Sequence, residues 1–266
     1  MDHEAALAAY DVHVRQNTRP DGTGAVFESD GRVVRRIAPA GQGGCCVIWS
    51  ALDQACADAV IAEQVAALSS RAGPLEWKLF SYDLPPDLPS RLSAAGFIAQ
   101  EPESLMIAEA REVLSILAGA APPAGVELRR VTGPEGVDLV ARVHEMVFGA
   151  DESALRASLL SQLAGDPGAT DLVVALAGEE PVSAGRIEFV PGTMFAGLWG
   201  GGTLPGWRRR GIYRALVRDR AEIAVQKDSQ YLTVDASEQS RPILERAGFT
   251  CVATTTPYLW SPGEDR

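Results

Sequence analysis

The chain has 266 residues, of which 46% are hydrophobic, so it can bury a sizeable core and an intrinsically disordered chain is excluded. It carries 35 acidic and 24 basic residues, and the formal charge of −11 disfavours nucleic acid and anionic membranes as partners while favouring a cationic one. No apolar run is long enough to span a bilayer, and the N-terminus lacks the pattern of a signal peptide, so we expect a soluble cytoplasmic protein.

The first half of the chain predicts a hairpin, a strand and a helix. Residues 24–39 are typical of a hairpin with Asp30-Gly31 at its turn. A strand over 45–51 follows, and a helix is expected within 53–73. No arginine-rich loop precedes this helix.

A linker is expected at residues 119–125. This segment is rich in Ala, Pro and Gly, and it separates a helical pattern from a strand-like one. We expect it to connect a first domain, residues 1–118, to a second domain, residues 126–266.

The second half predicts an α/β fold. Antiparallel hairpins come first, and a helical crossover then joins the strands near residues 199 and 232, so we expect a sheet of mixed direction. The expected strands cover 126–132, 171–178, 182–189, 193–202, 230–235 and 250–260, and the expected helices lie within 134–148, 151–164, 211–225 and 238–247.

The two halves share a faint repeat. A strand ends in Asp83, and Gly96 with a following Phe comes thirteen residues later; the same distance separates Asp235 from Gly248, again followed by Phe. Each unit then continues into a short strand. Strand, short helix closed by glycine, and strand are therefore written twice, which predicts a duplicated fold.

The segment "GWRRRGIYRAL", residues 206–216, gathers positive charge in an acidic chain. It connects a glycine-rich strand to a helix that begins near Gly211, so unpaired backbone N–H groups and arginine forks are expected to converge on an anion such as a phosphate. Glycine at this point lets the backbone approach a ligand closely. The alternative is a solvated basic helix whose arginines pair with acidic neighbours.

This pattern resembles the GNAT acyltransferase superfamily, whose acetyl-CoA loop reads Gln/Arg-x-x-Gly-x-Gly/Ala at a helix start. Residues 208–213 fit, except that Tyr213 replaces the last small residue, and residues 240–249 resemble a second family segment that ends in Gly-Phe. The resemblance covers residues 126–262 and extends through the repeat to the first half. It implies two GNAT-like domains, each with a mixed, mostly antiparallel twisted sheet flanked by helices, of which the first is degenerate.

The resemblance also implies where acetyl-CoA binds. The amides around residues 209–214 would hold its diphosphate, and the strand before the loop would pair with its pantetheine arm. The residues implied in coenzyme binding are Thr203, Leu204, Arg208, Arg209, Arg210, Gly211, Ile212, Tyr213, Ser237 and Ser240. No metal is implied, because the four cysteines form no CxxC pair and His144-Glu145 lacks the second histidine of HExxH.

The catalytic groups are less clearly marked. The position of the family's usual tyrosine acid holds Leu244, although a thiolate can leave without full protonation. Glu188 is a candidate base and Tyr258 a candidate site residue, while an outward-facing strand carboxylate and a packed tyrosine are the alternatives. A backbone N–H within residues 200–203 would stabilise the oxyanion. Further candidates for the acceptor site are Asp235, Ser237, Trp199 and His144, each with a capping, packing or surface role as its alternative.

Together these features predict an N-acetyltransferase that moves an acetyl group from acetyl-CoA to the amine of a small molecule by direct attack. One alternative is an acyl-CoA binding or sensing protein without catalysis, favoured by the missing tyrosine. Another is a structural or interaction protein with no affinity for coenzyme A. The sequence indicates neither the acceptor nor the oligomeric state.

Overall fold

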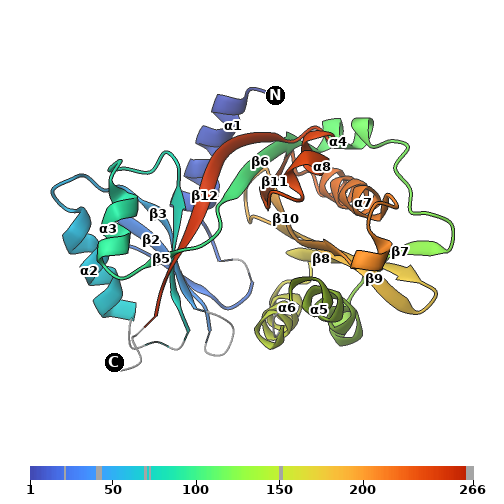
Figure 1. The fold of residues 1–266 in the computed structure, drawn as a ribbon, viewed down its shortest axis with the longest axis horizontal. Helices are drawn as coiled ribbons and strands as arrows, with labels where there is room; N and C mark the ends of the chain where they lie inside the picture. Colours follow the sequence, from blue (N-terminus) through green and yellow to red (C-terminus); the bar gives the residue numbers. More distant parts are fainter. Residues whose placement is uncertain (21, 40–43, 69–70, 72, 150–151, 262–266) are drawn as a thin grey trace.

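A twisted sheet runs through both halves of the computed structural model, which describes residues 1–20, 22–39, 44–68, 71, 73–149 and 152–261 (Figure 1). In the described residues its strand order is β1-β2-β3-β4-β12-β6-β11-β10-β9-β8-β7, with β5 paired to β12 at the side. The elements of the first half are α1 (His3–Tyr10), the π-helical turn η1 (Asp11–Gln16), β1 (Val26–Ser29), β2 (Val33–Ile37), β3 (Cys45–Ser50), α2 (Ala57–Leu68), β4 (Leu75–Phe80), α3 (Leu88–Ala94), β5 (Ile98–Ala99), β6 (Glu103–Glu109) and α4 (Ala110–Ile116).

The second half adds the elements that the sequence predicts, within a few residues of the expected bounds. They are β7 (Val126–Val131), α5 (Gly133–Phe148), α6 (Ser153–Gly165), β8 (Thr170–Ala177), β9 (Glu180–Phe189), β10 (Phe195–Thr203), the 3-10 turn η2 (Pro205–Trp207), α7 (Ile212–Gln226), β11 (Tyr231–Ala236), α8 (Arg241–Glu245) and β12 (Thr250–Trp260). Helices α5 and α6 pack on one face of the sheet and α7 lies on the other (Figure 1).

The predicted repeat is confirmed. Each half contains a parallel strand pair joined by a helix, β3 with β4 through α2 and β10 with β11 through α7. The short helices α3 and α8 follow, and Gly96 and Gly248 leave them in the left-handed conformation, with φ values of 91° and 94°. The α/β fold of two GNAT-like units is therefore present.

The sheet does not follow the predicted boundary at residues 119–125. β6 precedes the linker, yet it pairs with β11 and with the first part of β12. The last part of β12 leaves the second half and pairs with β4 instead. We therefore distinguish a first unit (β1–β5, α1–α3 and the end of β12) from a second unit (β7–β11, α5–α8, with β6 and the start of β12). The chain segments 1–118 and 126–266 stay a prediction as domains.

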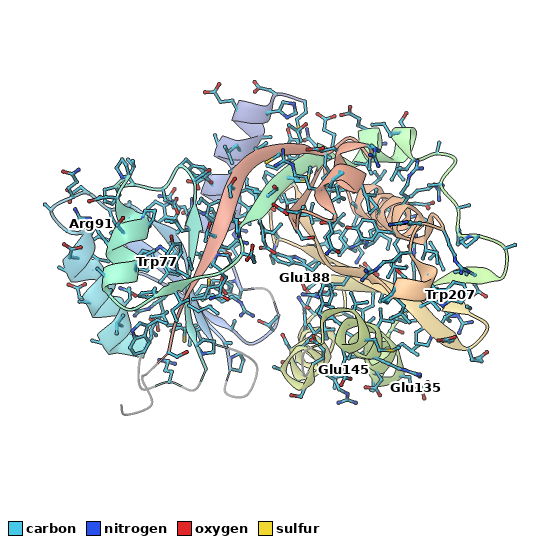
Figure 2. All side chains as sticks on the ribbon, viewed as in Figure 1. Trp77, Arg91, Glu135, Glu145, Glu188 and Trp207 are labelled. Carbon is cyan, nitrogen blue, oxygen red and sulfur yellow. The ribbon has the colours of Figure 1, made fainter. Side chains whose placement is uncertain are left out.

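The course of β12 corrects one expectation. Tyr258 pairs in register with Trp77 of β4 and is buried in the hydrophobic cluster of the first unit, together with Phe97 and Leu92. Figure 2 labels Trp77 in that unit, far from Glu188. Tyr258 is therefore a core residue of the first unit, because it lies in the last part of β12, which pairs with β4.

A polar cluster lies at the seam between the units. Lys78 of β4 forms an ion pair with Asp235 of β11, and the side chains are 17% and 6% exposed. Burial lowers the pKa of Lys78, but the charges of Asp235, Tyr10 and Glu76 and the hydrogen bond to Asp235 together outweigh burial, so the net shift is upward. Burial raises the pKa of the Glu76 carboxyl, and the charge of Lys78 only partly offsets this effect. Burial also raises the pKa of the Glu103 carboxyl. The seam therefore contains three carboxyl groups, those of Asp235, Glu76 and Glu103, and Lys78 forms an ion pair with only the first of them.

We predict that a fragment of residues 119–266 does not fold as a monomer. Without β6, β11 has an unpaired edge and the start of β12 loses its partner, which favours aggregation. A fragment of residues 101–266 keeps β6 and serves as the matched control. Size-exclusion chromatography and urea unfolding should show a cooperative monomer only for the longer fragment. A 119–266 fragment that is monomeric and unfolds cooperatively would show that the second unit does not need β6, a strand from before the linker.

We also predict a pH-dependent effect of Glu76→Gln on stability. Because burial raises the pKa of Glu76 in the folded state, its protonated form stabilises the fold below 4.5, its ordinary value, and that contribution is lost as the pH rises through the folded value. The free energy of unfolding of Glu76→Gln should exceed that of the native protein at pH 7 and approach it near about pH 4. Exposed Glu101→Gln is the control in urea titrations at both pH values. If the two proteins differed equally in free energy of unfolding at both pH values, the raised pKa of Glu76 would be contradicted.

Candidate functional site

The parallel pair of the second unit opens partway along its length. β10 and β11 are in register from Phe195 with Tyr231 to Gly197 with Thr233, and no pairing follows although both strands continue. From Leu198 onward, the edge of β10 that faces β11 has no strand partner in the described residues. Its backbone groups are therefore available to a ligand that extends along the strand.

A β-bulge lies in this open part of β10. The register with β9 shifts between Trp199 and Gly202, and Gly200 has a φ of 58°. A Cβ added at Gly200 would lie 2.7 Å from Nη1 of Arg186 and 3.1 Å from Nε2 of His144. Glycine is required here by the backbone conformation and by the close approach of these two side chains.

The arginine-rich loop follows the bulge and ends at the N-terminus of α7. Gly211 occupies the N-cap in the left-handed conformation, with a φ of 85°. No side chain caps the helix, and its first turn contains no acidic residue. The first backbone N–H groups of α7 and the positive end of its dipole therefore face outward without a neutralising group from the described residues.

The three arginines of this loop are exposed and take different roles. Arg208 donates from Nε to the carbonyl oxygen of Thr203 at 3.0 Å, which fixes the loop to the end of β10. The guanidinium of Arg210 lies 4.8 Å from the ring centre of Trp207. Within the described residues, Arg208, Arg209 and Arg210 form no ion pair, so the alternative of arginines tied to acidic neighbours does not describe this loop.

Tyr213 explains how the loop tolerates a bulky residue at the last motif position. Its ring lies under the bulge, where a Cβ on Gly201 would come within 3.0 Å of it. Beside it, the buried Arg220 donates to the carbonyl oxygens of Leu216 and Arg186, each at 3.2 Å. The side chain of Tyr213 thus points to the sheet, and only its amide remains for the loop.

At the corresponding place in the first unit, side chains of the chain itself bind the backbone groups, beside a cavity of about 450 Å³ lined in part by residues 49–53 and 82–84. The carboxylate of Asp53 accepts hydrogen bonds from the amides of Ala55 and Cys56, both at 2.9 Å, just before α2. Arg15 of η1 donates to the carbonyl oxygen of Ile48 at 2.9 Å, beyond the last pair of β3 with β4. Arg15 is held there by Asp83, at 2.9 Å. In the described residues, Asp53 thus binds amides just before α2 and Arg15 binds the carbonyl oxygen of Ile48, whereas the second unit has no such side chains at these places.

The structure brings most of the predicted coenzyme residues around the end of β10 and the start of α7. Thr203 and Leu204 are buried, and Leu204 donates its amide to Val182, so their side chains lie inside the fold. Ile212 is also buried and offers only its amide. Ser237 and Ser240 follow the end of β11, and their side-chain hydroxyls form a hydrogen bond at 3.3 Å. Coenzyme contacts of these residues stay a prediction.

Glu188 lies on β9, and Figure 2 shows it in the space between the two units. Its carboxylate accepts a hydrogen bond from Nε of Arg186 at 2.5 Å. Trp199 lies beside the seam, where Nζ of Lys78 is 5.7 Å from its ring centre. The candidates Glu188, Trp199 and Asp235 thus surround the open part of β10, whereas Tyr258 does not.

The sequence alone did not indicate the partner of His144. Nδ1 of His144 lies 2.6 Å from Oε1 of Glu152, and the two side chains are 19% and 12% exposed. Eight residues and the end of α5 separate them, so no helical spacing signals the pair. Elsewhere, the described residues contain no cluster of three potential metal ligands and no helix long and apolar enough to cross a membrane.

Comparison with known proteins finds this fold over nearly the whole chain. A GCN5-related N-acetyltransferase from Kribbella flavida has a TM-score of 0.71 at 16% identity, covering 97% of both chains. A tandem GNAT protein from the clavulanic acid biosynthesis pathway has a TM-score of 0.61 at 13% identity, covering 99% of this chain and 95% of that one. A conserved protein of unknown function from Staphylococcus epidermidis has a TM-score of 0.62 at 13% identity, covering 91% and 96%. No family model and no curated protein matches the chain. The chain thus has the GNAT fold in a tandem arrangement.

Proposed function

We propose that the chain is an N-acetyltransferase that transfers the acetyl group of acetyl-CoA to the amine of a small molecule in the cytoplasm. The observation that carries this proposal is the N-terminus of α7, which in the described residues has no side-chain cap and three arginines without an ion pair, beside the open edge of β10. A diphosphate fits the first feature and an amide-containing arm fits the second. Both features occur in the second unit, whereas in the first unit Asp53 and Arg15 bind the corresponding backbone groups.

The residues present suit coenzyme A by charge and by hydrogen bonding. Arg209, Arg210 and the remaining nitrogens of Arg208 would contact phosphate oxygens, and the amides of Gly211 to Tyr213 would add backbone donors. Gly200 and Gly201 have no register partner on β9, so their backbone N–H groups would be the donors to the developing oxyanion, and one such donor is worth about 3 kcal/mol when preorganised. The protein's part in the reaction is to bind, orient and stabilise charge.

The acceptor would enter on the opposite side of β10, between the two units. The candidate groups there are Asp235, Glu103, Glu188 and the partly exposed ring of Trp199. Carboxylates and an aromatic face suit a cationic or amine-bearing molecule. The overall charge of −11 favours the encounter with such an acceptor over nucleic acid or a membrane.

A second candidate function is acyl-CoA binding without catalysis. Leu244 occupies the position of the usual tyrosine acid and is fully buried in the core of the second unit, so that position supplies no proton donor. Thiol release from acetyl-CoA across a panel of small amines separates the two functions. Release with at least one amine supports the transferase, whereas tight binding with no release supports the sensor.

We predict that the double variant Arg208→Ala, Arg210→Ala weakens acetyl-CoA binding by roughly 100-fold or more, because two charge-assisted contacts to phosphate are lost. Isothermal titration measures the change. The matched control is Arg32→Ala, Arg129→Ala, which removes the same charge from exposed arginines with surface ion pairs of little energetic weight. A dissociation constant within twofold of the native value in the first double variant would remove the loop from the coenzyme site.

A further inference from the structure

His144 and Glu152 form a histidine–carboxylate pair at the C-terminal end of α5. The 2.6 Å distance between Nδ1 and Oε1 is that of a charge-assisted hydrogen bond. The ring of His144 also packs on Phe148, with their centres 4.3 Å apart. A carboxylate on Nδ1 fixes the ring orientation and keeps the proton on that nitrogen, so Nε2 is left as a proton acceptor.

The other ring nitrogen, Nε2, has no hydrogen-bond partner among the described residues and lies at the bulge of β10. Nε2 and Cδ2 are the His144 atoms that a Cβ on Gly200 would meet, both at 3.1 Å. Gly200 lies in the part of β10 that has no strand partner on the side of β11. The pair therefore reaches from the face of the sheet covered by α5 to the bulge of β10, and the arginine loop begins at the end of the same strand.

The charged groups around His144 leave it better placed as a base than Glu188. Glu152 approaches from the start of α6, and the guanidinium of Arg186 approaches Gly200 from β9. The carboxylate of Glu188 already accepts a hydrogen bond from that same guanidinium at 2.5 Å. Arg186 thus separates the carboxylate of Glu188 from the imidazole.

We propose that His144 is the general base of the acetyl transfer and that Glu152 is its positioning residue. The inference rests on the proposed function. As the amine nitrogen bonds to the thioester carbonyl carbon, Nε2 takes the proton that the nitrogen loses. The C–S bond then breaks with its electron pair on sulfur, and the imidazolium returns the proton to the thiolate. The acceptor gains an acetyl group, free thiol forms, and His144 ends as it began.

The tautomer of His144 tests the geometry without any substrate. The chain has three histidines, so ¹⁵N NMR of the imidazoles in the labelled full-length protein gives few signals, and His144→Gln assigns those of His144 by their loss. We expect Nδ1 to carry the proton and Nε2 to be unprotonated in the neutral ring, and Glu152→Gln to reduce that preference. A ring protonated on Nε2, or one unchanged by Glu152→Gln, would overturn the proposed role of the pair.

Kinetics and binding then separate this inference from the proposed function. We expect His144→Gln to lower kcat by about 100-fold or more while the dissociation constant of acetyl-CoA stays within twofold, and imidazole to restore part of the activity of His144→Ala. Glu152→Gln should lower kcat less, with partial recovery in Glu152→Asp. The matched controls are the exposed His13→Gln and Glu145→Gln.

If none of the amines tested causes the native protein to release thiol from acetyl-CoA, the proposed function fails. If the native protein is active and His144→Gln keeps its kcat, the assignment of the base fails and the function stands. A larger loss in Glu188→Gln than in His144→Gln would likewise return the role of base to Glu188.

Discussion

The candidate site of the second unit depends on the backbone of β10, which pairs with β11 over only part of its length. A strand edge in a sheet normally pairs, and β10 does so with β11 only as far as Gly197. Beyond that point the strand bulges at Gly200 and leads into a helix whose N-terminal amides have no cap. In the described residues, one short segment therefore has both peptide groups without a strand partner and a concentration of positive charge, and a ligand that carries amides and a diphosphate would stabilise each feature.

In the first unit, side chains of the chain itself bind the backbone groups at the corresponding place. Arg15 donates one hydrogen bond to the carbonyl oxygen of Ile48, and Asp53 supplies a carboxylate just before α2. These two residues do with side chains what the proposed coenzyme would do in the second unit. The comparison is internal to one chain, so it is independent of any relative. It also explains why the first unit can be retained as a support: its strand β4 holds the end of β12, and its Lys78 holds Asp235 at the seam.

The sequence predicted the fold well where the signal was local. Hydrophobic periodicity and glycine positions located the strands and helices of the second half, and the Asp-to-Gly spacing revealed the repeat. The arginine loop was also found locally, because its charge, its glycine and its helix are contiguous. Strand exchange was missed, since nothing in the composition of β6 or β12 records which sheet position each strand takes. The error at Tyr258 follows from that, because a residue was assigned to the unit in which its strand begins. The pairing of His144 with Glu152 was missed for a similar reason, as it depends on the turn between two helices.

The central claim is that the second unit alone binds acetyl-CoA, through the start of α7 and the open edge of β10. A crystal structure of the full-length protein with coenzyme A tests it most directly. The account predicts diphosphate oxygens on the amides and guanidinium groups of residues 208–213, and a pantetheine arm along β10 beyond Gly197 that reaches the bulge facing His144. Coenzyme bound at the start of α2, or at the seam with the arginine loop unoccupied, would contradict it.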